Sequence, residues 1–225
     1  MAWVEKLYAA LIEGGRWQMY LEGLGNTLLI SVIACGLGLM LGCLVSVIKY
    51  LAAGNRAWRA AGWVADLYTT VIRGTPMMLQ LLIIYGLAAW THGIYACFIG
   101  FGLNSGAYVA EIIRAGIGSV DPGQAEAGRS LGMSRLSVMR RIILPQAVKN
   151  ILPAMFNEFI SLIKETSIAG YVAVTDLTKA AEAVKSRTFN LIPHVLVAVV
   201  YLAMVICLTQ LQKRLERRLA RSDRG

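Results

Sequence analysis

The chain has 225 residues, of which 57% are hydrophobic and 16% are charged, and its mean hydropathy is +0.59. A soluble domain typically carries about 25% charged residues. Because the apolar residues here also form long runs, the composition indicates a membrane protein and argues against a soluble domain with a large apolar core. The net charge of +9 comes from Lys and Arg gathered beside those runs, which membrane topology explains better than nucleic acid binding does.

Five apolar runs are long enough to cross a bilayer, which takes about 20 residues of helix. In chain order they are residues 27–48, 58–90, 95–117, 148–174 and 191–211. The first contains Gly38 and Gly42, a spacing that lets helices approach closely in lipid. The second is interrupted by Arg73-Gly74-Thr75-Pro76, where Pro76 is expected to kink the helix.

The basic residues predict the orientation of these spans. They gather after the first span, after the third span and in the C-terminal tail: Arg56, Arg59, Arg129, Arg135, Arg140, Arg141, Lys149, Lys213, Arg214, Arg217, Arg218, Arg221 and Arg224. Basic loops favour the cytoplasm. Five spans in the inner membrane, with the N-terminus external and the C-terminus cytoplasmic, place all three basic segments inside. The turn at 91–93 and the segment 175–190 then lie outside.

The external segment at about 175–190 has an amphipathic helical pattern. Leu177, Ala180, Ala181 and Val184 share one face, and Thr175 or Asp176 is a candidate N-cap. We expect this helix to lie at the external membrane interface.

The cytoplasmic loop at about 119–147 carries two sets of helix boundary signals. Asp121 and Pro122 are suited to begin a short helix, and Gly132 is suited to end it in a left-handed conformation. Ser134 then predicts the start of a second helix that runs toward Pro145. The first helix is too short and too polar to span a membrane, so we expect it at the cytoplasmic surface.

This loop resembles the EAA loop of ABC-importer permeases. That pattern is Glu-Ala-Ala, three residues, Gly, nine residues, Ile, one residue and Leu-Pro, and here it falls on Glu126, Ala127, Gly128, Gly132, Ile142, Leu144 and Pro145. The spacing matches throughout. The one departure is Gly128 in place of the second alanine, which removes a methyl group and slightly weakens the helix.

Further segments are similar to permeases of the polar amino acid group, which includes transporters of histidine, glutamine, arginine and opines. They are the Arg73–Pro76 turn, residues 103–108 with 110–112, Asn157-Glu158, residues 164–167 and Asp176-Leu177-Thr178. The resemblance covers about residues 20–219.

The resemblance implies an all-α membrane protein with the type I ABC importer permease fold, in which residues 1–225 form one transmembrane domain. It implies an ATP-binding cassette ATPase dimer that binds ATP, a second permease subunit that is identical or paralogous, and an external amino-acid-binding protein. It also implies that the EAA residues couple the chain to the ATPase. We expect contact with membrane lipid, no nucleic acid, no metal and no cofactor bound by this chain.

Polar residues inside the spans are the candidate substrate site, because ionisable groups in a membrane interior are costly and usually functional. They are Arg73, Thr75, Asn104, Asn157, Glu158 and Ser161. Arg73 is suited to bind a carboxylate through two hydrogen bonds, and Glu158 is suited to receive an ammonium group. The alternative for Arg73 is a structural ion pair with a protein carboxylate. We expect Lys164 with Glu165, and Glu111 with Arg114, to be structural pairs.

The sequence holds no phosphate-binding GxxxxGK[ST] loop and no hydrolase pattern, so we expect a transport subunit and not an enzyme. The predicted function is the permease subunit of an ATP-driven importer that carries polar amino acids across the inner membrane by alternating access. Two alternatives remain open: a membrane anchor or sensor that keeps this fold without transport, and an ATP-independent channel or carrier.

Overall fold

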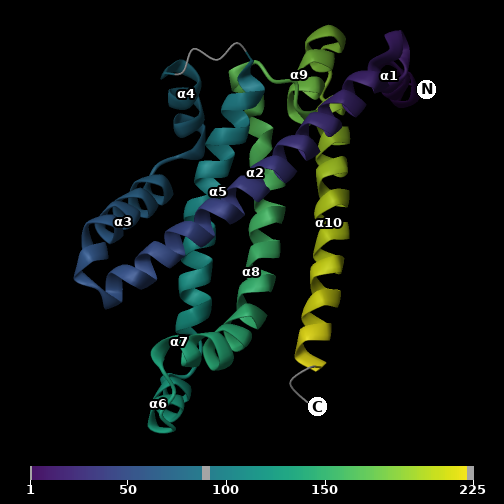
Figure 1. Cartoon of the computed structure of the whole chain (residues 1–225). Helices are drawn as coiled ribbons and strands as arrows, with labels where there is room; N and C mark the ends of the chain where they lie inside the picture. The colour runs from purple at the N-terminus through teal and green to yellow at the C-terminus, as the bar shows by residue number, and fades with distance from the viewer. Residues whose placement is uncertain (1, 88–91, 222–225) are drawn as a thin grey trace.

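The computed structural model describes residues 2–87 and 92–221, and all the regular secondary structure in these residues is helical (Figure 1). The helices are α1 Ala2–Leu11, η1 Glu13–Gly15, α2 Arg16–Gly54, η2 Arg56–Trp58, α3 Arg59–Gly74, α4 Met77–Leu87, α5 Gly93–Gly118, α6 Pro122–Ser130, α7 Arg135–Val138, η3 Met139–Ile143, α8 Leu144–Glu165, η4 Thr166–Val172, α9 Leu177–Thr188 and α10 Ile192–Arg221. The end of the second predicted span and the start of the following turn, residues 88–91, lie outside the described residues.

Three helical stretches in the described residues are long and apolar enough to cross a membrane: Glu13–Gly54, Gly93–Gly118 and Ile192–Leu219. They contain the first and third predicted spans and all of the fifth except Leu191. The helix α2 has 39 residues, which at 1.5 Å per residue is about 58 Å and nearly twice the hydrocarbon thickness of a bilayer. In Figure 1 it crosses α5 obliquely, and a helix longer than the bilayer is thick is generally accommodated by tilting.

Close packing of α2 on α5 depends on the two glycines that the sequence singles out. A Cβ atom on Gly38 would lie 2.8 Å from Cβ of Ser105, and one on Gly42 would lie 2.5 Å from Cγ1 of Val109. Any side chain at these positions would push the helices apart. The predicted role of Gly38 and Gly42 in helix packing is confirmed.

The second predicted span is broken more sharply than a kink. The stretches Arg56–Gly74 and Met77–Leu87 meet at 111°. Thr75 is extended, with φ of −121° and ψ of 147°, as expected for a residue before proline, and Pro76 has no N–H to continue the helix. The two halves therefore form a bent pair, which counts as at most one further crossing.

The fourth predicted span is a helix, but its bounds differ from residues 148–174. The helix α8 ends at Glu165 and is followed by the 3-10 turns of η4. It packs against α5 and α10 and runs beside them (Figure 1). By itself it is long enough but not apolar enough to count as a membrane span. Polar side chains in such a helix are accommodated between other helices.

The loop helix that begins after Ser134 continues into α8 instead of stopping near Pro145. A π-helical turn, η3, joins α7 to α8 just before this proline. The widened turn accommodates a residue that cannot donate to the carbonyl four residues earlier. The loop that carries α6 and α7 is therefore connected to α8 without a break.

The amphipathic stripe of α9 is confirmed, but it faces protein. Leu177, Ala180, Ala181 and Val184 are all buried, and this face packs on α2 and α10. Asp176 is the N-cap and accepts hydrogen bonds from the backbone N–H groups of Thr178 and Lys179. The helix is held as part of the protein and does not offer this face to lipid.

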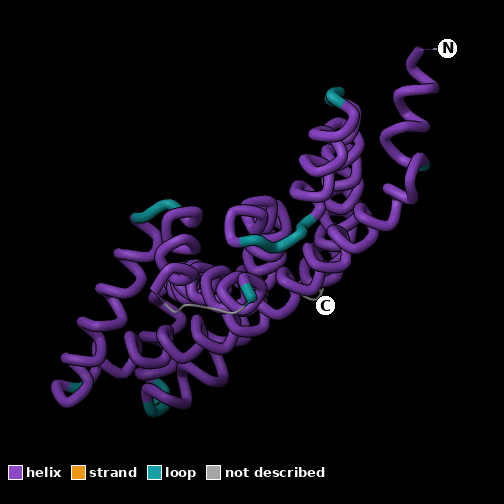
Figure 2. Tube along the Cα trace, turned by 90° about the horizontal axis from the view of Figure 1, so that it is seen from above, coloured by secondary structure: helices purple, strands orange, loops and turns teal. Residues whose placement is uncertain are grey.

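The two ends of the molecule differ in charge. In Figure 1 the end of α2, the α6–α7 loop and the end of α10 lie at one end, and these carry the three basic segments. The N-terminus and α9 lie at the other. Seen from above in Figure 2, the molecule is elongated, with α1 at one extremity. The main buried core, which includes Ile30, Leu81, Phe101 and Leu162, lies where α2, α4, α5 and α8 meet.

Candidate functional site

The break between α3 and α4 is held by one buried amide that the sequence analysis did not single out. Nε2 of Gln80 donates to the carbonyl oxygens of Ile72 (2.7 Å) and Thr75 (3.0 Å) and to the Thr75 hydroxyl (2.8 Å). The Thr75 hydroxyl in turn donates to the carbonyl oxygen of Val71 at 2.8 Å. Carbonyls that the break frees from helical hydrogen bonding are thereby satisfied, which keeps the sharp bend stable in an apolar setting.

Asn104 extends this arrangement from α5. Its Nδ2 donates to Oε1 of Gln80 at 3.1 Å, and its side chain is buried. Two of the predicted substrate residues, Thr75 and Asn104, thus contact the same glutamine. Both help to hold the shape of the break.

Arg73 lies at the end of α3 and packs against α5. Its Nη1 is 3.4 Å from Oε2 of Glu111, and its guanidinium carbon is 5.4 Å from the ring centre of Tyr108. The side chain remains 42% exposed. The guanidinium therefore has the protein carboxylate that the structural alternative requires, and it also has open surface on which another anion can bind.

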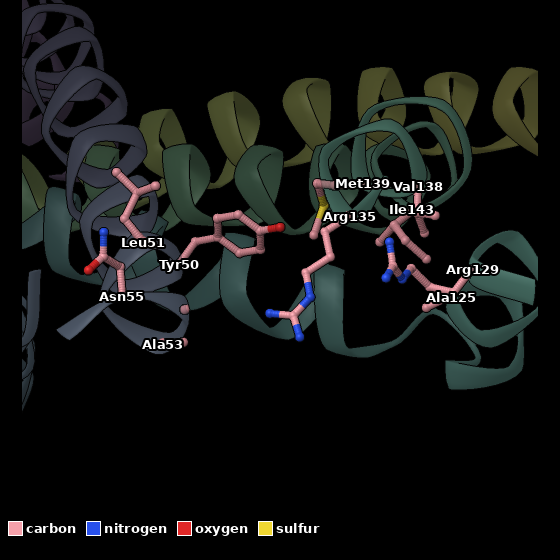
Figure 3. A pocket seen from close by; sticks show the side chains of 11 residues that line it. Tyr50, Leu51, Ala53, Asn55, Ala125, Arg129, Arg135, Val138, Met139 and Ile143 are labelled. Atoms are coloured by element: carbon pink, nitrogen blue, oxygen red, sulfur yellow. The ribbon is translucent and has the colours of Figure 1, made fainter. Parts of the chain in front are cut away.

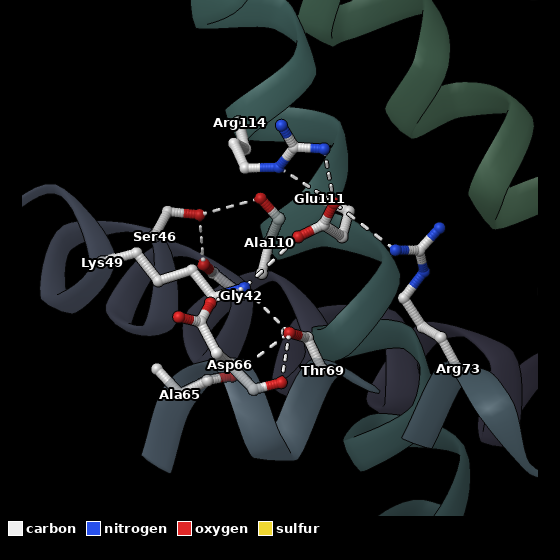
Figure 4. Close-up of polar contacts among 10 residues, drawn as sticks. All are labelled: Gly42, Ser46, Lys49, Ala65, Asp66, Thr69, Arg73, Ala110, Glu111 and Arg114. Atoms are coloured by element: carbon white, nitrogen blue, oxygen red, sulfur yellow. Dashed lines mark hydrogen bonds and ion pairs between the residues drawn. The ribbon is translucent and has the colours of Figure 1, made fainter. Parts of the chain in front are cut away.

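Glu111 is the centre of a larger charged cluster (Figure 4). The predicted pair with Arg114 is formed, with Nη2 of Arg114 at 2.8 Å from Oε2. On the other side, Nζ of Lys49 lies 3.3 Å from Oε1 of Glu111 and 3.0 Å from Oδ1 of Asp66. Three cations, including Arg73, face two carboxylates, so the cluster has an excess of positive charge. This favours an additional anion near its exposed members.

Glu158 lies on the α8 side of α5. Its side chain lies near Ser105 and is half-buried. Ser161, one turn further along α8, is also half-buried, whereas Asn157 is exposed on the surface of the single chain. Glu158 approaches α5 at Ser105 and Arg73 approaches it at Tyr108. These two α5 residues are three apart, which corresponds to about 4.5 Å along the helix axis.

Lys164 and Glu165, at the end of α8, are both exposed. Their predicted structural pairing stays a prediction.

The loop between α5 and α8 has the helix boundaries that the sequence predicts. Asp121 accepts a hydrogen bond from the Gly123 N–H at 2.9 Å and caps α6. Gly132 ends α6 with φ of +80°. Its N–H donates to the Arg129 carbonyl and the next N–H, of Met133, donates to the Gly128 carbonyl, which is the Schellman arrangement. Ser134 caps α7 through the Ser137 N–H at 3.2 Å.

Gly128 has a packing reason that helix propensity does not reveal. A Cβ atom there would lie 2.8 Å from Cδ1 of Ile142 and 2.9 Å from Cγ2 of Val138. The larger side chains of η3 and α7 fill the space of the absent methyl group, so Ile142 of the EAA pattern packs directly on α6. Glu126 and Ala127 are exposed on α6, and Leu144 and Pro145 are exposed where α8 begins.

A family model described as the binding-protein-dependent transport system inner membrane component matches residues 38–221. The chain belongs to this family. It is a membrane permease subunit, and the predicted family resemblance is confirmed.

Curated relatives of this permease come from several bacteria. It is 40% identical over 209 residues to the arginine transport system permease protein ArtQ of Bacillus subtilis, covering 90% of this chain and 93% of the relative. It is 43% identical over 204 residues to a putative glutamine transport system permease protein GlnP of Rickettsia bellii, covering 88% and 91%. It is 36% identical over 217 residues to the L-cystine transport system permease protein TcyB of Bacillus subtilis, covering 94% and 91%.

Solved structures support the fold. The permease superposes on a chain from the crystal structure of an amino acid ABC transporter with histidines, with a TM-score of 0.82 and 40% identity, covering 89% of this chain and 94% of the other. It also superposes on a chain of the MetNI methionine ABC transporter in an inward-facing conformation, with a TM-score of 0.79 and 17% identity, covering 92% and 99%. The fold is that of a type I ABC importer permease.

Proposed function

We propose that this permease carries polar amino acids through a site formed on α5 by Arg73 on one side and Glu158 on the other. The observation that carries the proposal is that a basic and an acidic side chain approach α5 at positions three residues apart. A free amino acid presents a carboxylate and an ammonium group only a few bonds apart. Relatives named for arginine, glutamine and cystine transport support the substrate class.

In this proposal the substrate carboxylate binds Arg73 on its exposed side, beside Glu111. The carboxylate of Glu111 holds the guanidinium in position while the site is empty, and the excess positive charge of the cluster attracts the substrate anion. The substrate ammonium binds Glu158, and Asn157 and Ser161 on the same helix contact the substrate side chain. Thr75 and Asn104 are positioning residues, because their polar atoms hold Gln80 and the bend next to Arg73.

Coupling is proposed to reside in the cytoplasmic loop. The helix α6, with Glu126 and Ala127 exposed, docks on an ATP-binding cassette ATPase dimer, which binds and hydrolyses the ATP. The second permease subunit completes the pathway, and an external binding protein delivers the substrate. Because α6 packs on Ile142 and the loop continues into α8, movement of α6 with the ATPase is transmitted to α8, the helix that bears Glu158.

The direct test is uptake of a panel of labelled amino acids by the reconstituted complex. The expected result is ATP-dependent uptake of a polar amino acid that an excess of the unlabelled substrate abolishes. Uptake that persists without ATP would favour a carrier or channel. No uptake of any amino acid, despite an intact complex with its ATPase, would favour the anchor or sensor.

A further inference from the structure

A cavity of about 660 Å³ lies between the end of α2 and the α6–η3 loop (Figure 3). It is formed by two segments far apart in sequence, residues 50–55 and residues 125–143. It is not part of the α5 site, and the EAA pattern assigns it no role.

The lining of this cavity is basic on one side. Arg129 and Arg135 both line it, and no lining residue is acidic. Arg129 uses Nη1 to donate to the Met133 carbonyl at 2.7 Å, while Figure 3 shows the guanidinium of Arg135 extended into the open space. A guanidinium has five N–H donors and matches the geometry of phosphate oxygens. The polar side of the cavity is therefore suited to a phosphate group.

The rest of the lining is largely apolar and includes Leu51, Val138 and Met139. A free phosphate ion has no apolar part that could contact such a surface, whereas the acyl chains of a phospholipid begin close to its phosphate. The cavity also lies where the apolar run of α2 gives way to Arg56 and Arg59. Trp58 lies between these two arginines and is 40% exposed. Tryptophan is enriched at the level of lipid headgroups.

We propose that this cavity binds the phosphate headgroup of an anionic phospholipid, with Arg135 as its main ligand, Arg129 as a second one, and the apolar wall against the upper acyl chains. The bound lipid then bridges the end of α2 to the EAA loop, so the lipid composition of the membrane adjusts how firmly the loop is held. The proposal requires this end of the spans to lie at a membrane surface and does not depend on any particular substrate.

The experiment compares Arg135→Gln with Arg141→Gln in the purified complex. Both arginines are exposed residues of the same loop, but only Arg135 lines the cavity. Arg129 is left unchanged because its hydrogen bond to Met133 helps to close the end of α6. Retention of phosphatidylglycerol and phosphatidylcholine is measured by native mass spectrometry, and the thermal midpoint is measured with each lipid added.

The wild-type complex is expected to retain phosphatidylglycerol in preference and to be stabilised by it. Arg135→Gln should weaken this binding about fivefold, since one basic residue near a membrane surface contributes about 1 kcal/mol, and Arg141→Gln should behave as the wild type. Equal retention of the two lipids, or equal effects of the two substitutions, would overturn the proposal. So would stabilisation by glycerol phosphate as large as that by the lipid, which would indicate a soluble ligand. Loss of the ATPase from Arg135→Gln without anionic lipid would show that the cavity instead receives an acidic side chain of that partner.

Discussion

Arg73 and Arg114 form a matched pair for testing the substrate carboxylate site, because both guanidiniums contact the same Glu111 carboxylate. Only Arg73 also lies over Tyr108. If Arg73 binds the substrate, Arg73→Gln removes charged hydrogen bonds worth about 1.5–3 kcal/mol and weakens uptake roughly 10- to 100-fold. Arg114→Gln removes the excess charge of the cluster but no proposed substrate contact, so it should weaken uptake clearly less than Arg73→Gln does. Equal losses in the two variants would mean that Arg73 only neutralises Glu111.

Glu158 and Glu165 provide the corresponding comparison for the substrate ammonium. Both are on α8, but Glu158 is half-buried beside Ser105, whereas Glu165 is exposed at the end of the helix. Glu158→Gln keeps the shape and the hydrogen-bonding capacity while removing the negative charge. Uptake in proteoliposomes is expected to fall at least tenfold for Glu158→Gln and to persist for Glu165→Gln. Failure of the Glu158→Gln complex to assemble would instead assign this carboxylate a structural role.

At the scale of single residues, the sequence identifies the charged side chains inside the spans better than it identifies their partners. The Glu111–Arg114 pair follows from spacing on one helix, but Lys49 and Arg73 reach Glu111 from α2 and α3, and no local pattern predicts such meetings. Gln80 was not predicted because its side chain is uncharged, and an amide in an apolar run is a weaker signal than an ionisable group. Its position four residues after Pro76, within reach of the carbonyls that the proline leaves free, was the available signal.

Among the elements, the α3–α4 bend depends on Gln80. Gln80→Leu preserves the approximate volume but leaves the Ile72 and Thr75 carbonyls and the Asn104 amide without this partner. Each buried polar group left unsatisfied costs about 1–3 kcal/mol, so the thermal midpoint in detergent should fall by several degrees. Leu79→Ala, at the adjacent and 52% exposed position, is the control and should have little effect. An unchanged midpoint for Gln80→Leu would show that the bend is held by its surroundings.

The proposed coupling helix, α6, depends on the conformation of Gly132. At φ of +80°, with nothing within 4 Å of the place of a Cβ atom, a substitution there meets only backbone strain, roughly 1–2 kcal/mol for a residue with a β-carbon. Gly132→Val should distort the end of α6 and reduce ATPase association and substrate-stimulated ATP hydrolysis. Gly132→Asn should keep most of both, because asparagine tolerates this conformation. Glu126→Lys, which reverses an exposed charge on α6, should also weaken association.

Co-purification of a tagged ATPase, followed by ATPase assays in liposomes, measures these effects. Full association and full stimulation in both Gly132→Val and Glu126→Lys would remove the coupling role of α6. Equal losses in Gly132→Val and Gly132→Asn would show that the loop responds to the side chain and not to the backbone conformation.

The boundaries of these elements were predictable to different degrees. Caps such as Asp121 and Ser134 were identified correctly, because a capping side chain acts on backbone groups two or three residues away. The 111° bend and the π turn before Pro145 were not. Proline predicts that regular hydrogen bonding stops, but the direction in which the chain continues depends on distant groups such as Gln80 and Asn104.

Over the whole molecule, two helices connect the candidate substrate residues to the loop that carries α6 and α7. From Asn104 the helix α5 runs to Gly118, just before α6, and from Leu144 the helix α8 runs to Glu158. Each segment has a rise of about 21 Å, and both are continuous helix, although α8 carries Pro153 in its interior. A displacement of the loop is therefore passed to both sides of the site at once, whereas Arg73 lies beyond the bend and moves with α3. This predicts that the distance between Arg73 and Glu158 changes during the transport cycle.

The orientation of the whole molecule is testable by cysteine accessibility. The basic segments all lie at one end (Figure 1), and basic loops favour the cytoplasm. In a variant whose four native cysteines are replaced by alanine, a cysteine at Asn190, beside α9, should react in intact cells with a reagent that cannot cross the membrane. A cysteine at Ser130, at the end of α6, should react only after the cells are opened. Labelling of Ser130→Cys from outside would invert the orientation and place the coupling helix where no ATPase can reach it. Labelling of both positions from outside would contradict an odd number of membrane crossings between Ser130 and Asn190.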